Sequence, residues 1–119
     1  MPPGASARQR AGSAAEQRAL DYLTARGLRL VARNFRVRVG ELDLVLQDRD
    51  ELVFVEVRQR ASAAWGGAAA SVTPAKQARV RRAAQVFLAQ HCGPGRWPPM
   101  RFDVVAIEGG QLHWIPGAF

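Results

Sequence analysis

The sequence predicts one mixed α/β domain in which two helices flank a five-stranded sheet, in the order α-β-β-β-α-β-β. Two segments begin with helix-capping residues, and five short segments are rich in Val, Leu, Ile and Phe. The second helix falls between the third and fourth strands, so it can provide the crossover that a parallel strand pair requires and make the sheet mixed. A chain of 119 residues has the size of one domain.

The first helix is expected to start at the boundary of the domain. Residues 1–12 are rich in Pro, Gly, Ala and Arg, which predicts a flexible basic tail, and residues 13–119 are predicted to form the domain. Ser13 is a candidate N-cap, with Glu16 three positions later as in a capping box. Gly27 is a candidate helix end.

The other elements follow from apolar runs and from the loop residues between them. Residues 61–72 are mostly small and predict a loop, and Thr73 before Pro74 marks the start of the second helix. The expected elements are strands at 28–39, 41–46 and 51–58, a helix at 74–90, and strands at 101–107 and 111–115.

The chain is strongly basic, but its charge is unevenly distributed. A net charge of +7 and a pI near 11.4 predict a polyanionic partner, most often a nucleic acid. Residues 41–58 hold six acids against two arginines, whereas the segments before and after them carry +6 and +5. Three of these acids, Asp48, Asp50 and Glu51, fall at the predicted hairpin turn and are expected to be solvated.

Cysteine content and hydropathy predict a soluble cytoplasmic protein that does not enter a membrane. Cys92 is the single cysteine and cannot form an internal disulfide, which is typical of a reducing compartment. No apolar run approaches the roughly 20 residues that a membrane-spanning helix needs. The first ten residues lack the apolar core of a signal peptide.

Asp43 and Glu56 stand out because each interrupts an apolar strand, where an ionised carboxylate needs a partner, a proton or a metal ion. Their side chains share a face only if the hairpin loop has an even number of residues. A loop centred on Asp48 and Arg49 pairs Asp43 with Phe54, diagonal to Glu56, whereas an odd loop separates the two acids.

With an even loop, the two carboxylates form a site for magnesium or manganese. The alternative is a pair of strand-end acids bridged to Arg58 and Arg60.

Two helical residues are expected to point toward the same place. Glu16 aligns with Leu20 on the apolar face of the first helix, although a capping-box glutamate would have the same position. Lys76, the single lysine of the chain, aligns with Val80 and Phe87 on the sheet-facing side of the second helix. The alternative for Lys76 is a side chain that snorkels at the rim of the core.

Three segments resemble a known family: "NFRVRVGELDLVLQDRDELVFVEVRQR", "WGGAAASVTPAKQ" and "RFDVVAI". They are similar to the YraN family of small bacterial endonuclease-like proteins, within the PD-(D/E)XK nuclease superfamily and related in fold to archaeal Holliday junction resolvases. The resemblance implies a restriction-endonuclease-like core with a mixed sheet flanked by helices. It implies metal-binding roles for Asp43 and Glu56 and matches Glu16 to a first-helix glutamate. Arg58 stands where the superfamily usually has lysine.

Two functions from different classes follow. The first is a magnesium-dependent endonuclease acting on DNA, including branched DNA, with Glu16, Asp43, Glu56, Arg58 and Lys76 as its catalytic set. Asp43 and Glu56 would hold the metal ion with Glu16 completing its shell, and the two cations would clamp the scissile phosphate. A two-fold homodimer would suit a junction substrate.

The second function is a non-catalytic module that binds nucleic acid or a protein partner on a nuclease scaffold. In either case exposed arginines would contact phosphates. The candidate contacts are Arg33, Arg36, Arg38, Arg60, Arg79, Arg81 and Arg82. Trp65, in the small-residue loop, would either face the substrate or pack against the domain.

Overall fold

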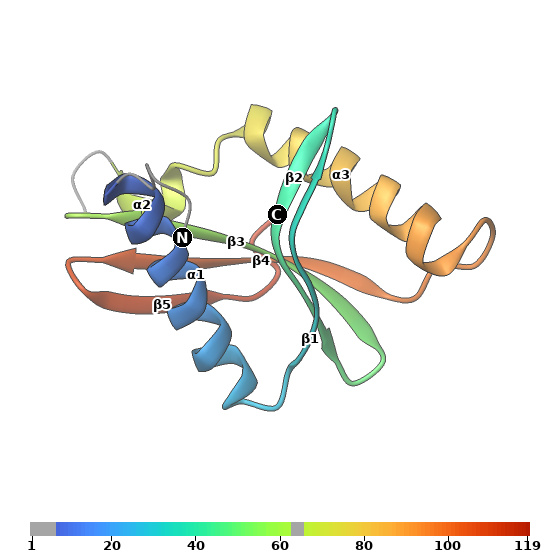
Figure 1. The fold of residues 1–119 in the computed structure, drawn as a ribbon, viewed down its shortest axis with the longest axis horizontal. Helices are drawn as coiled ribbons and strands as arrows, with labels where there is room; N and C mark the ends of the chain where they lie inside the picture. The colour runs from blue at the N-terminus through green and yellow to red at the C-terminus, as the bar shows by residue number, and fades with distance from the viewer. Residues whose placement is uncertain (1–6, 63–65) are drawn as a thin grey trace.

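The structure, a computed structural model that describes residues 7–62 and 66–119, contains one five-stranded mixed sheet with helices (Figure 1). The elements are α1 (Ala7–Thr24), β1 (Arg29–Val37), β2 (Gly40–Asp48), β3 (Glu51–Arg60), α2 (Gly67–Ala70), α3 (Pro74–Cys92), β4 (Met100–Glu108) and β5 (Gln111–Ile115). The predicted mixed α/β class is therefore confirmed, and α2 is an addition within the segment predicted as a loop. Trp65 lies outside the described residues.

The strands lie in chain order across the sheet, β1-β2-β3-β4-β5. β3 and β4 are parallel, joined through α2 and α3, and the other neighbouring pairs are antiparallel. Leu44 and Val53 pack in a cluster with α1, whereas Val45 and Phe54 pack in a cluster with α3. Because neighbouring residues of a strand point to opposite faces, α1 and α3 cover the two sides of the sheet.

The first helix differs from its prediction at its start. It begins at Ala7, so residues 7–12 of the predicted tail are helical and the expected helix start at Ser13 is wrong. Alanine, arginine and glutamine are strong helix formers, and their frequency before Ser13 outweighs the cost of Gly12. Ser13 is therefore not an N-cap, and the capping-box explanation for Glu16 no longer holds.

The second long helix begins as predicted. Thr73 is its N-cap, and its hydroxyl oxygen accepts a hydrogen bond from the Lys76 amide at 3.3 Å. Pro74 occupies the first turn, where its missing N–H leaves no hydrogen bond unmade. None of the described helices is both long and apolar enough to span a membrane.

The β2–β3 hairpin has a two-residue turn, as an even loop requires, but the turn lies one residue later than predicted. Asp48 pairs with Glu51 across Arg49 and Asp50, and Arg49 adopts a φ of 58°. Val45, rather than Asp43, therefore lies opposite Phe54. The pairing ends at Leu44 and Val55, and just beyond it Asp43 lies near enough to Glu56 for their charges to interact.

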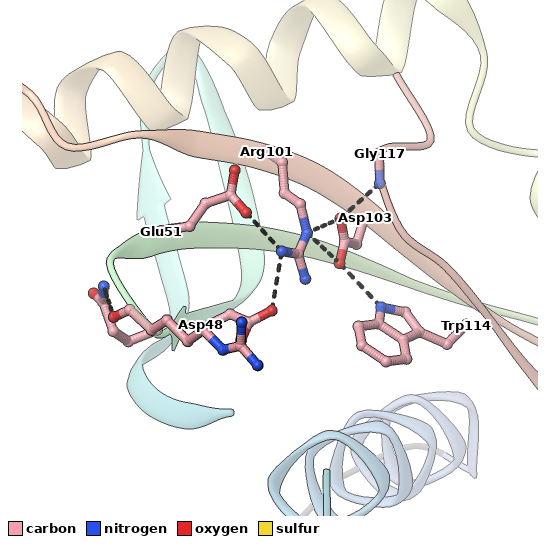
Figure 2. A network of polar contacts seen from close by, with 8 residues as sticks. Asp48, Glu51, Arg101, Asp103, Trp114 and Gly117 are labelled. Atoms are coloured by element: carbon pink, nitrogen blue, oxygen red, sulfur yellow. Dashed lines mark hydrogen bonds and ion pairs between the residues drawn. The ribbon is translucent and has the colours of Figure 1, made fainter. Parts of the chain in front are cut away.

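The acidic turn is not simply solvated, because two of its three acids bind Arg101 of β4 (Figure 2). One terminal nitrogen of Arg101 lies 3.0 Å from Asp48 and 2.7 Å from Glu51. The expectation of a solvated turn is therefore wrong for these two acids, whereas Asp50 is exposed. The contact was not predicted because it depends on the parallel register, which places the start of β4 beside the start of β3.

Arg101 also binds Asp103, which is 0% exposed (Figure 2). The Nε of Arg101 donates to Asp103 at 3.0 Å, and the Trp114 indole N–H and the Gly117 amide donate to it at 3.0 and 2.9 Å. A buried carboxylate is tolerated only with such partners. This Arg101 network joins the β2–β3 turn to β4 and to the end of the chain.

Replacing Arg101 by methionine, which keeps volume but removes the charge, is expected to lower the free energy of unfolding by about 3 kcal/mol. The loss arises because Asp103 stays buried without its cation, and because Asp48 and Glu51 then repel each other. Urea denaturation measures it. The matched control is Arg96→Met, an exposed site whose change should stay within about 0.5 kcal/mol. Equal stability of the two variants would contradict this role for Arg101.

Candidate active site

Asp43 lies where β2 separates from β3. The pairing of the two strands runs from the hairpin turn to Leu44 and Val55, whereas β2 stays paired with β1 as far as Gly40. Figure 1 shows this end of the β1–β2 hairpin extending away from the rest of the sheet. At the separation, the Asp43 carboxylate accepts a hydrogen bond from the Val57 amide at 2.9 Å, so a side chain takes the place of a strand partner.

The separation also disturbs the alternation of β2. Leu42 and Val45 both pack on the α3 side, although three residues apart in a regular strand would point to opposite faces. Opposite this region, Asn34 of β1 adopts a φ of 54°, a conformation that asparagine tolerates better than most residues. Asp43 therefore sits at an irregular point between the two sides of the sheet.

Glu56 is buried beside Asp43. It is 2% exposed, lies on the same strand face as Phe54, and its Oε1 has no hydrogen-bond partner among the described residues. Burial, followed by repulsion from Asp43, raises the pKa of Glu56 to about 8, although Lys76, the Asp43 backbone and Arg58 oppose the rise. The Asp43 backbone thus satisfies part of the Glu56 carboxyl group, whereas its Oε1 has no partner among the described residues.

The other two acids are also perturbed. Burial is the main cause that raises the pKa of Asp43, against the opposing hydrogen bond from Val57. Burial and then Asp43 raise the pKa of Glu16, which Arg33 and a hydrogen bond from the Asn34 side chain oppose. Asp43 therefore acts on two carboxylates from different elements, Glu16 of α1 and Glu56 of β3.

Two cations approach the acids without neutralising them directly. Arg58 and Lys76 lower the pKa values of Asp43 and Glu56 through the charge they carry. Within the described parts of the chain, however, no ion pair of 4.0 Å or less joins them to either acid. The alternative of acids bridged to Arg58 and Arg60 is therefore not the observed arrangement.

Arg58 is held from the side of α2. Its Nε donates to the Ser71 hydroxyl at 2.8 Å, and that hydroxyl donates to the Ala68 carbonyl at 2.5 Å. The Ala68 amide in turn donates to Glu108 at 2.8 Å. A Cβ on Gly67 would lie within 2.3 Å of the same Glu108 carboxylate, so this close approach requires glycine. The guanidinium is thus bound by Ser71, whose own position is fixed by bonds within α2 and from α2 to β4.

Ser71 and Glu108 are absent from the predicted site residues because their roles depend on the tertiary position of α2. A weak signal was present: two consecutive glycines at 66 and 67 permit a close backbone approach, as a substrate loop would also require. Nothing in the sequence relates that loop to the end of β4.

A pocket of about 420 Å³ opens beside Asp43. Four of the predicted site residues line it, namely Glu16, Asp43, Arg58 and Arg60, together with Gly12, Ala15, Val57 and Gln59. Glu56 is not part of the lining and lies deeper, while Lys76 approaches from α3. All five predicted catalytic residues therefore lie in one region, but only Glu16, Asp43 and Arg58 line the pocket.

The remaining predicted phosphate contacts lie in three places, and all of them are exposed. Arg33 and Arg36 lie near Glu16, where Arg33 contacts Gln17 at 3.1 Å and Arg36 pairs loosely with Glu41 at 3.7 Å. Arg79, Arg81 and Arg82 belong to α3, and Arg38 lies in the β1–β2 turn.

Residues 15–107, which include all five predicted catalytic positions, match the model of Uncharacterised protein family UPF0102. The chain belongs to this family. It is 56% identical to a UPF0102 protein of Ralstonia nicotianae, over 99% of this chain and 90% of that relative. It is 53% identical to one from Bordetella parapertussis over 98% and 67%, and 52% identical to one from Herminiimonas arsenicoxydans over 95% and 89%.

The donor set of this UPF0102 protein fits a hard divalent cation in part. No group of three His, Cys, Asp or Glu side chains within residues 7–62 and 66–119 is arranged to hold one metal ion. Asp43 and Glu56 nevertheless offer carboxylate oxygens, and the buried Oε1 of Glu56 is unpartnered. Magnesium is commonly held by one or two carboxylates, with waters and substrate phosphate as the other ligands.

The raised pKa of Glu56 gives the UPF0102 protein a stability that depends on pH. Between the ordinary value of 4.5 and about 8, the folded chain holds a proton on Glu56 that the unfolded chain has lost. This stabilisation is complete below pH 4.5 and is lost as the pH rises through 8. Without divalent cations, the unfolding temperature should therefore fall across this range.

Glu56→Gln should flatten the fall and raise the unfolding temperature more at pH 8 than at pH 5. Asp50→Asn, at an exposed turn position, is the control and should retain the wild-type slope. Parallel curves for wild type and Glu56→Gln would show that Glu56 titrates normally.

Proposed function

We propose that this protein is a magnesium- or manganese-dependent endonuclease acting on DNA, with the restriction-endonuclease-like fold of the YraN family and the PD-(D/E)XK superfamily it resembles. The observation that carries the proposal is the unpartnered, buried Oε1 of Glu56 beside Asp43. Structural carboxylates of this chain look different: Asp103 is equally buried but accepts from three donors.

The electrostatics of the pair support a cation site. Burial raises the pKa of both acids, and the charge of Asp43 raises that of Glu56 further, because neither burial nor a neighbouring negative charge favours ionisation. Arg58 and Lys76 reduce this cost without contact pairs, which leaves the carboxylate oxygens available to a ligand. Strongly perturbed acids beside an open pocket are a common feature of catalytic sites.

Each residue then has a role that follows from its place. Asp43 and Glu56 would hold the cation, and Glu16 would act from the α1 side of the pocket. A bound divalent cation supplies Lewis-acid polarisation of the phosphoryl group and lowers the pKa of water. Arg58 and Lys76 would bind the scissile phosphate and stabilise the negative charge that develops on it.

Arg58 suits phosphate binding but not proton abstraction, because its guanidinium remains protonated. Ser71 occupies its Nε, and its two terminal nitrogens make no hydrogen bond or ion pair with the described residues. They are therefore available as a two-pronged donor for phosphate oxygens. If an amine takes part in the chemistry, it is that of Lys76.

A non-catalytic binding module is the second candidate, favoured by arginine at position 58 and by the exposed arginines of α3. In that case the same pocket would bind phosphate without cleaving it. A two-fold dimer, which would present two pockets to one branched DNA molecule, belongs to the catalytic proposal.

Manganese should bind to the wild-type protein, and Asp43→Asn or Glu56→Gln should weaken binding at least about tenfold, because each removes a charged ligand. Glu56→Gln should also reduce cleavage of duplex, single-stranded, flap or four-way-junction DNA by at least about a hundredfold. Its DNA affinity should be unchanged or higher, since a negative charge near the phosphate is gone. Calorimetry and gel-based cleavage measure these effects.

The control for metal binding and cleavage is Asp50→Asn, which removes an exposed acid at the β2–β3 turn and should affect neither by more than about twofold. Metal uptake that is identical in wild type, Asp43→Asn and Glu56→Gln would refute the cation site. DNA binding that persists without any cleavage would leave the binding module as the function.

Arg58→Lys should lower kcat/KM about ten- to hundredfold, because an ammonium group lacks the planar fork that can donate to Ser71 and to two phosphate oxygens together. Ser71→Ala should lower it about three- to tenfold, and Ser71→Thr should retain most activity because it keeps the hydroxyl. In an Arg58→Lys background, Ser71→Ala should have little further effect. Additive losses would show that Ser71 acts independently of Arg58.

A further inference from the structure

A second pocket, remote from the acids, lies where the C-terminal half of α3 faces the loop that leads to β4. Its volume is about 160 Å³, and its walls include Arg81 and Leu88 of α3 with Trp97, Met100 and Phe102. Trp97 is 41% exposed, which is unusual for the largest apolar side chain. The pocket therefore presents an aromatic surface that the described residues do not cover.

The hydrogen-bonding group of Trp97 is already used within the fold. Its indole N–H donates to the Gly93 carbonyl at 3.3 Å, just after the end of α3. This bond ties the indole to the chain, while the exposed part of the ring system is apolar. A rigid, exposed aromatic ring offers stacking rather than a further polar contact.

Arg81 adds a positive charge at the same place. Its guanidinium carbon lies 5.7 Å from the centre of the Phe102 ring and 5.2 Å from that of Phe119. These two rings are stacked on each other at 5.2 Å, and Phe102 stacks on Phe54 in the core. The arginine is thus supported by an aromatic stack yet remains exposed.

The charge of α3 indicates what kind of ligand the pocket takes. The helix carries Lys76, Arg79, Arg81 and Arg82 and no acidic residue. Its occupant should therefore combine a flat apolar group with negative charge. A nucleotide has both, because its base can stack on an aromatic ring while its phosphate pairs with arginine.

We propose that this pocket receives one unpaired nucleobase, which stacks on Trp97 while its backbone phosphate contacts Arg81. A base in a duplex is paired and stacked on its neighbours, so only a single-stranded or displaced base can enter. The proposal rests on the proposed function in one respect, that the substrate is nucleic acid. It adds that the substrate contains an unpaired segment.

The geometry of α3 relates the two sites. The pocket residues Ala84 and Leu88 lie eight and twelve positions after Lys76 on the same helix. At 1.5 Å per residue this is roughly 12 to 18 Å along the axis. One nucleic-acid strand that follows α3 can therefore contact Lys76 and the aromatic pocket together.

The test measures binding of the full chain to three oligonucleotides of about twelve nucleotides, without divalent cations. They are a single strand, the same strand with abasic sites throughout, and its blunt duplex. Trp97→Ala should weaken single-strand binding roughly 5- to 150-fold, the range for loss of one base stack, and Trp97→Phe should restore most of it. Neither change should alter affinity for the abasic strand by more than about twofold.

Tryptophan fluorescence provides a readout that a structural role would not produce. The single strand should quench wild type more than Trp97→Phe, and the abasic strand should quench both equally. Equal affinity of wild type and Trp97→Ala for the single strand would overturn the proposal, as would quenching of the wild type by the abasic strand as strong as that by the normal strand. Displacement of the strand by a tryptophan-rich acidic peptide, with no difference between normal and abasic strands, would instead assign the pocket to a protein partner.

Failure of this proposal is separable from failure of the proposed function. Base binding is measured without metal and can be repeated in Glu56→Gln, so it does not depend on cleavage. If Trp97 is quenched but no DNA is cut, the base pocket stands and the endonuclease proposal falls. If DNA is cut but Trp97→Ala binds as wild type does, the opposite holds.

Discussion

The site depends on one hydrogen bond, from the Val57 amide to the Asp43 carboxylate. Where β2 departs from β3, the backbone groups of β3 lose their strand partners, and a buried unpaired amide is costly. Asp43 satisfies that amide with a side chain, and in doing so it is held beside Glu56. This hydrogen bond therefore satisfies the backbone amide where the strands part, and it also places the Asp43 carboxylate beside Glu56.

The charge of the acids is balanced in two different ways within one sheet. At the β2–β3 turn, Arg101 contacts its carboxylates directly, and every oxygen of Asp103 has a donor. At the other end of β3, the cations act through space, and Glu56 keeps an unpartnered oxygen. Complete pairing is typical of a stabilising cluster, whereas incomplete pairing leaves room for a ligand.

The sequence was sufficient for the mixed sheet, for the start of α3 at Thr73, and for the meeting of Asp43 with Glu56, because these follow from periodicity, capping and turn parity. It was not sufficient for the exact register, since a turn at 48–49 and one at 49–50 satisfy the same pattern. The start of α1 was misplaced because Gly12 and Ser13 look like a helix boundary although their neighbours favour helix. The Ser71 and Glu108 contacts depend on where a four-residue helix packs, which no local pattern encodes.

The Arg101 network has a mechanical consequence for the hairpin that carries the acids. It closes β2 onto β3 at the turn, while at Asp43 the same two strands have already parted. The hairpin is thus held by ion pairs at the turn, whereas beyond Leu44 each of its strands pairs with its other neighbour, β2 with β1 and β3 with β4. The spacing of the two carboxylates is therefore set by the outer strand pairs rather than by the hairpin turn.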